Sequence, residues 1–209
     1  MNEPSDARSI QIRRGRRLQY FTIAYNSLEG LVSIIAGLFA GSVSLIGFGF
    51  DSLIEVASGA AVLWRLRHDP DPVRREKAER ITVLAVGWCF VALAGYIVYD
   101  SGSTLLRREP PERSIPGIVI AALSLVVMPM LASAKRRVAA AIGSAAVKAD
   151  SRQTDFCTYL SAILLCGLVL NALFGWWWAD PVAALTMVPV IAHEGIQGLR
   201  GRQCCHDCG

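Results

Sequence analysis

The sequence predicts an all-α membrane protein of six transmembrane helices with both termini in the cytoplasm. Hydrophobic residues make up 53% of the 209-residue chain, and six apolar runs approach the length of about 20 residues that a helix needs to cross a bilayer core. The distribution of basic residues sets the orientation. We therefore expect a multi-pass protein surrounded by the lipid bilayer of a plasma membrane or a bacterial inner membrane.

The predicted spans follow one another with short connections. In chain order they cover residues 20–40, 45–64, 81–106, 115–134, 156–175 and 181–199. Residues 1–19 are predicted to form a basic cytoplasmic N-terminus, residues 20–199 a single six-helix domain, and residues 200–209 a Cys- and His-rich cytoplasmic tail. The polar but helix-prone segment 135–156 is expected to be a cytoplasmic helical extension that runs into the fifth span.

The basic residues give the orientation of these spans. All but three of the 21 Lys and Arg residues lie on one side of the predicted membrane, which includes the segments 65–80 and 135–152. The exceptions are Arg107, Arg108 and Arg113. Basic residues accumulate on the cytoplasmic side of membrane proteins. The net charge of +4 is thus a signature of topology, and we do not expect the chain to bind nucleic acid.

The second predicted span carries two acidic residues, Asp51 and Glu55, four positions apart. This spacing places both carboxylates on the same face of a helix. A carboxylate in hydrocarbon costs at least about 2.5 kcal/mol, so the pair must face an interior, a cation or water. Asp155 offers a third oxygen ligand from another helix at a compatible depth. The three carboxylates predict a divalent metal site; the alternative is an acidic pair that faces an internal water cavity.

Three stretches of the sequence resemble segments of one known family of membrane proteins. The first predicted hairpin reads AYNSLEGLVSIIAGLFAGSVSLIGFGFDSLIEVASG, the fifth span begins with ADSRQTDFCTYLSAILL, and the sixth opens with WWADPVAAL. They resemble the first two, the fifth and the sixth helices of the cation diffusion facilitators, whose second helix carries an acidic pair at this spacing. The chain is most similar to short, six-helix members that lack the C-terminal cytoplasmic domain, such as vesicular transmembrane zinc transporters.

The resemblance implies a transporter that exports a divalent metal, with zinc as the first candidate, by alternating access in a homodimer that exchanges the metal for protons. Asp51 and Glu55 match the acidic pair of the family, and Asp155 matches the acid that ends its fifth-helix motif. The metal is cargo and no cofactor is expected. No nucleophile and base constellation indicates an enzyme. The alternative function is a membrane regulator or scaffold that binds metal without moving it.

One position departs from the pattern of the family. Four residues before Asp155, where histidine or aspartate is common, the chain has Ser151. Without an imidazole the ligands are richer in oxygen, which leaves manganese, iron or cobalt open as cargo beside zinc. Asp150, Asn26, Glu29 or water are the candidates to complete the ligand shell.

The C-terminal tail is a second candidate metal-binding segment. Cys204, Cys205, His206 and Cys208 supply soft ligands, and cytoplasmic thiols stay reduced. The tail is predicted to capture metal near the entrance of the transport path, through a site shared between two tails. The alternative is a flexible tail without a role in metal binding.

Overall fold

The computed structural model describes residues 3–67, 72–108 and 111–200. Each of its six helices contains a stretch that is long and apolar enough to cross a membrane. The predicted fold class is therefore confirmed, whereas the side of the membrane on which the termini lie stays a prediction. The helices are α1 (Glu3–Ala40), α2 (Val43–Arg67), α3 (Pro72–Arg107), α4 (Ile115–Ile142), α5 (Ala145–Phe174) and α6 (Ala179–Leu199).

The surface of the bundle is that of a protein in lipid. Large apolar side chains are highly exposed on the outside, as Phe39 (83%) and Leu106 (87%) illustrate. Inside the bundle, by contrast, many polar and charged side chains are fully buried. This distribution is what a bilayer requires, because polar groups are stable there only when they face the interior of the protein.

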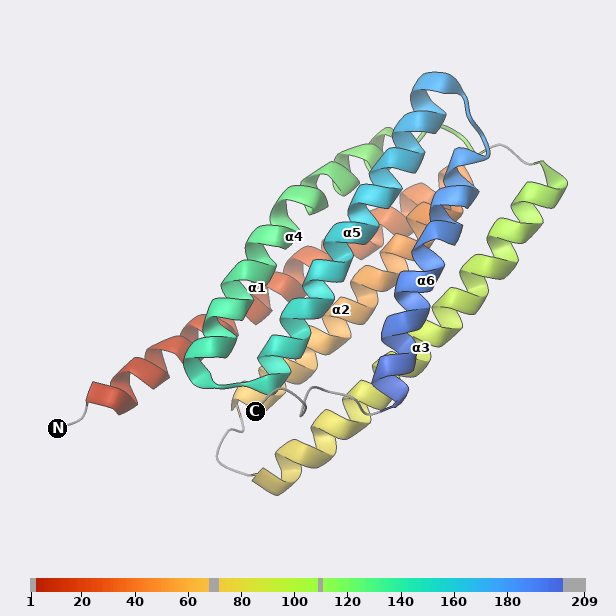
Figure 1. Cartoon of the computed structure of the whole chain (residues 1–209). Coiled ribbons are helices and arrows are strands. Elements are labelled where there is room, and N and C mark those ends of the chain that lie inside the picture. Colours follow the sequence, from red (N-terminus) through yellow and green to blue (C-terminus); the bar gives the residue numbers. More distant parts are fainter. Residues whose placement is uncertain (1–2, 68–71, 109–110, 201–209) are drawn as a thin grey trace.

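Helix α2 is the central element of the bundle. It packs against α1, α3, α5 and α6, and its apolar window is the most buried of the six spans. Figure 1 shows α1, α2, α4 and α5 grouped together, with α3 and α6 paired along one side. The start of α1 and the end of α6 lie at the same end of the bundle. The buried side chains of α2 can therefore meet partners from several helices.

The α1–α2 hairpin is held at very short range by glycine. The connection turns at Gly41, whose φ of 62° favours glycine. A Cβ atom added to Gly30 would lie 3.1 Å from the carbonyl oxygen of Gly49, so the two backbones touch there. Small residues permit this close approach of helices in membranes. The contact fixes the register in which the polar face of α1 meets α2.

The first helix is longer than its predicted span. Residues 3–19, which the sequence predicts as a separate N-terminus, are helical and continuous with the rest of α1. Gln19, at the end of this segment, is 1% exposed. This part of the chain therefore belongs in part to the bundle.

The segment 135–156 is divided between two helices, which corrects the expectation that it extends the fifth span alone. Helix α4 continues to Ile142 and ends at Gly143, which has a φ of 62°. Helix α5 then starts after Ser144, whose hydroxyl accepts a hydrogen bond from the Val147 amide at 3.3 Å. The turn folds the ends of α4 and α5 against each other, so that polar residues from both helices meet.

Candidate functional site

Both acidic residues of α2 point into the bundle. Asp51 is 5% exposed and Glu55 is 1% exposed. They lie one helical turn apart, yet their carboxylates have different neighbours. This burial agrees with the high cost of a carboxylate in hydrocarbon, and it makes the identity of those neighbours decisive.

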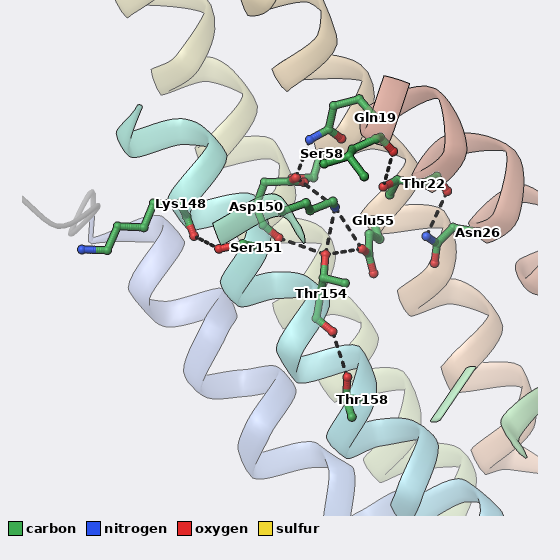
Figure 2. Close-up of polar contacts among 12 residues, drawn as sticks. Gln19, Thr22, Asn26, Glu55, Ser58, Lys148, Asp150, Ser151, Thr154 and Thr158 are labelled. Atoms are coloured by element: carbon green, nitrogen blue, oxygen red, sulfur yellow. Dashed lines mark hydrogen bonds and ion pairs between the residues drawn. The ribbon is translucent and has the colours of Figure 1, made fainter. Parts of the chain in front are cut away.

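Glu55 lies beside a buried lysine. The ammonium group of Lys135, from α4, is 3.5 Å from Glu55 Oε1 and donates to the Thr154 hydroxyl of α5 at 2.9 Å. That hydroxyl in turn donates to the same Glu55 oxygen at 2.6 Å. Figure 2 shows Glu55 and Thr154 pointing toward each other across the interface of α2 and α5. One oxygen of Glu55 thus lies near a compensating cation and accepts a hydrogen bond from a hydroxyl.

Asp150 is the second partner of this lysine. The ammonium group of Lys135 lies 2.9 Å from Asp150 Oδ2, and the amide of Gln19 donates to the same oxygen at 2.6 Å. The Ser58 hydroxyl donates to Oδ1 at 3.4 Å. We call Lys135, Glu55, Asp150, Thr154 and Gln19 the lysine cluster. Its members come from α1, α2, α4 and α5, and all are nearly fully buried.

Asp51 and Glu29 form a second, acidic part of the site. Glu29 of α1 is fully buried. Its Oε2 accepts a hydrogen bond from the Ser52 hydroxyl at 3.1 Å, and its Oε1 has no hydrogen-bond partner among the described residues. Asp51 lies within electrostatic range of Glu55, Glu29 and Glu194 of α6. Among the ion pairs of the described residues, none contains Asp51 or Glu29. We call these two residues the acidic pocket.

The polar face of α1 runs along both parts of the site. Its members recur every three or four residues and are at most 1% exposed: Gln19, Thr22, Asn26, Glu29 and Ser33. The amide of Asn26 donates to the Thr22 carbonyl at 3.0 Å, which leaves Asn26 Oδ1 without a partner. The second oxygen of Glu55, Oε2, is also buried without a partner. An unmade hydrogen bond on a buried group costs about 1–3 kcal/mol, so these oxygens are suited to receive a cation or water.

Asp155, the predicted third ligand, lies apart from the acidic pair. Its side chain is 34% exposed and forms an ion pair with Arg136 of α4. The buried face of α5 instead carries Asp150 and Thr154, and Asp155 is turned about 100° from Thr154 on a helix. Ser151 is buried, and its hydroxyl donates to the Lys148 carbonyl of its own helix at 2.7 Å. The structure thus brings Asp51 and Glu55 to the interior but not Asp155.

The predicted metal ligands are not gathered into a closed cage. Within residues 3–67, 72–108 and 111–200, no three His, Cys, Asp or Glu side chains converge closely enough to enclose a metal ion. The predicted tail ligands Cys204, Cys205, His206 and Cys208 lie outside the described residues.

Comparison with known proteins gives the family of this bundle. A model of the cation efflux transmembrane domain matches residues 20–200, which is most of the chain. The chain belongs to the cation efflux family. The resemblance of its hairpin and of its fifth and sixth helices to the cation diffusion facilitators is thereby confirmed, and with its six spans this cation efflux protein is a multi-pass protein of the cell membrane.

Curated relatives carry the same name in several bacteria. The chain is 27% identical over 183 residues to the cation-efflux pump FieF of Shewanella oneidensis, with 84% of this chain and 62% of the relative covered. It is 30% identical over 196 residues to the cation-efflux pump FieF of Klebsiella pneumoniae, with 88% and 64% covered. The chain therefore spans a little under two thirds of the length of these relatives.

The most important residue that the sequence did not single out in this cation efflux protein is Lys135. The sequence places it with the cytoplasmic basic residues, but it is fully buried. A usable signal exists in the spacing of the buried residues of α4, which recur every three or four positions and include Ser124, Met128, Leu131, Lys135 and Val138. Arg136 and Arg137, next in the chain, fall off this face and are exposed. Helical periodicity thus separates one lysine from two arginines in the same basic run.

Proposed function

We propose that this cation efflux protein exports a divalent transition metal from the cytoplasm, with zinc as the first candidate and manganese, iron or cobalt as alternatives. The proposal includes exchange for protons and a homodimeric assembly with both termini of each chain in the cytoplasm. The observation that carries it is the acidic pocket: two buried carboxylates, Asp51 and Glu29, that form no ion pair with any described residue.

The chemistry of the pocket suits a divalent cation. Buried carboxylates are unstable without compensating charge, and a doubly charged ion supplies that charge from outside the protein. Asp51 and the buried, unpartnered oxygens of Glu55, Asn26 and Glu29 are the oxygen donors that the described residues offer it. Binding in this conformation requires these groups to move together. Such a rearrangement is compatible with a site that must also release its ion.

One neighbour of Asp51 favours zinc over harder cations. The thiol of Cys157, on α5, is 1% exposed and lies close enough to Asp51 for the two groups to interact electrostatically. Thiolates prefer zinc to manganese, whereas a site of oxygens alone prefers manganese or magnesium. Zinc is therefore placed first.

The proposal is tested by transport into proteoliposomes that contain the full chain. Uptake of zinc, manganese, iron and cobalt is measured with and without a pH gradient, for the wild type and for Asp51→Asn. Asp100→Asn is the matched control, because Asp100 lies on α3 and its carboxylate accepts a hydrogen bond from the Tyr96 hydroxyl of the same helix at 3.2 Å. We expect gradient-dependent uptake of zinc by the wild type and the control, and its loss in Asp51→Asn.

Each other result has a defined meaning. Failure of the wild type to move any of the four metals would refute transport. Metal binding without movement would favour the alternative of a regulator or scaffold. Transport that is independent of the pH gradient would remove only the proton exchange.

A further inference from the structure

The lysine cluster is a feature that metal binding at the acidic pocket does not by itself explain. A fully buried lysine is costly, and it is retained only where partners of opposite charge compensate it. The ammonium group of Lys135 has two such partners, Asp150 at 2.9 Å and Glu55 at 3.5 Å. One of these partners, Glu55, is also a predicted ligand of the transported metal. The same carboxylate is thus within reach of a built-in cation and of the cargo.

The two contacts of the lysine are unequal. Asp150 has the shorter contact and is itself fixed by the amide of Gln19 at 2.6 Å and by the Ser58 hydroxyl at 3.4 Å. Glu55 has the longer contact, made by Oε1, while its buried Oε2 has no hydrogen-bond partner in the part of the chain that the structure describes. Asp150 is therefore the anchor of the lysine, and Glu55 is the partner that can be exchanged.

We infer that Lys135 is an internal counter-cation that competes with the transported metal for the charge of Glu55 and so limits the affinity of the site. The inference rests on the proposed function. When a metal ion reaches Asp51 and Glu55, the ammonium group gives up Glu55 and stays with Asp150, so that no buried charge is left alone. When the metal leaves, Lys135 again compensates Glu55. Release of the ion is thereby favoured at the position where an uncompensated acidic pair would hold it.

The competition makes a prediction of opposite signs for two related variants. In Asp150→Asn, Lys135 loses its anchor and pairs with Glu55 alone, so zinc binding should weaken by about tenfold. In the double variant Lys135→Met with Asp150→Asn, both members of one ion pair are removed together. Glu55 then has no competitor, and zinc binding should become tighter than in the wild type by about tenfold.

The experiment uses the purified full chain in lipid nanodiscs. The dissociation constant of zinc is measured by competition with a fluorescent chelator for the wild type, Asp150→Asn and the double variant. Arg137→Met is the matched control, because Arg137 lies two positions from Lys135 in the same basic run and is exposed. Size-exclusion chromatography establishes that each variant is folded. The double variant leaves no unpaired member of the Lys135–Asp150 ion pair, so we expect it to fold more reliably than Asp150→Asn.

The outcomes separate this inference from the proposed function. Weaker zinc binding in Asp150→Asn together with tighter zinc binding in the double variant supports the competition. Simple damage to the fold would weaken zinc binding in both variants. Equal weakening in both would make Asp150 a metal ligand in its own right and would overturn the competition, as would two unchanged constants; in either case the proposed function would stand. A wild type that binds no zinc, manganese, iron or cobalt would refute the proposed function, and the inference would fall with it.

Discussion

Asp51 and Glu55 are one turn apart on the same helix, but one lies in the acidic pocket and the other in the lysine cluster. Glu55 is approached by a lysine and a threonine hydroxyl, at 3.5 and 2.6 Å. The charged groups that act electrostatically on Asp51 are the carboxylates of Glu55, Glu29 and Glu194. The residue type and the burial are similar, so the difference comes from the helices opposite. Charge compensation, rather than burial, therefore determines which of the two carboxylates remains available to bind a cation.

A third buried acid sharpens this comparison. Asp180, at the start of α6, is fully buried and forms no ion pair among the described residues. Its carboxylate accepts hydrogen bonds from the hydroxyls of Ser42, at 2.6 Å, and of Ser44. Hydroxyl donors from the α1–α2 connection and from the first turn of α2 thus satisfy it. Glu29 Oε1, by contrast, receives no hydrogen bond from the described residues, so this oxygen is available to a cation.

The largest effect is expected for Asp51→Asn. The change removes a negative charge from the acidic pocket while keeping the size of the side chain, and the affinity for a divalent ion depends strongly on the charge of its ligands. We expect zinc transport into proteoliposomes to fall by at least about a hundredfold. Near-normal transport would mean that the pocket without a lysine is not the functional half of the site.

The next largest effect is expected on the stability of the protein and comes from a change in the lysine cluster. Lys135→Met leaves Glu55 and Asp150 as unpaired buried acids, which should lower the free energy of unfolding by about 3 kcal/mol. Adding Asp150→Asn should recover most of this loss. Denaturant unfolding in detergent micelles measures both, with Arg137→Met as the control. An unchanged unfolding curve for Lys135→Met would show that the lysine does not compensate the cluster.

Glu29→Gln tests whether α1 contributes to the acidic pocket. The amide keeps the contact with Ser52 but removes the charge beside Asp51, so the dissociation constant of zinc should rise by about tenfold. Ser33→Ala, on the same buried face of α1, is the control and should leave the constant unchanged. Equal effects of the two changes would point to damage of the α1–α2 interface instead of loss of charge.

Cys157→Ser tests the preference for zinc. Replacement of the thiol by a hydroxyl leaves only oxygen donors beside Asp51, so the ratio of zinc to manganese transport should fall by about fivefold, with manganese itself little affected. Cys166→Ser is the control, because Cys166 lies on the exposed face of α5. An unchanged ratio of zinc to manganese transport would show that the Cys157 thiol does not contribute to the preference for zinc.

The smallest effect is expected for Asp155→Asn. Its carboxylate forms a partly exposed ion pair with Arg136, and such pairs contribute about 0–1 kcal/mol. In the arrangement of α5 seen here, zinc transport should change by no more than about twofold. A loss as large as that of Asp51→Asn would show that α5 turns during transport and brings Asp155 to the acidic pair, as the sequence predicts.

The sequence by itself determined the six membrane spans and the burial of Asp51 and Glu55. These features depend on composition and on the spacing of residues along one helix, and both are local properties of the chain. The family membership was also accessible, because its motifs lie in continuous stretches of the hairpin and of the fifth and sixth helices. The tail Cys and His residues stay a prediction.

Which charged side chains meet depends on the packing of the six helices. In the folded bundle Asp150 and Thr154 of α5 face α2, whereas Asp155 does not. Lys135, which the sequence groups with neighbouring arginines, lies between Glu55 and Asp150. The rotation of a helix about its axis depends on how several helices pack at once. A buried lysine needs compensating charge, which Lys135 receives from acids on two different helices, Glu55 and Asp150. Neither condition is written in a single stretch of sequence.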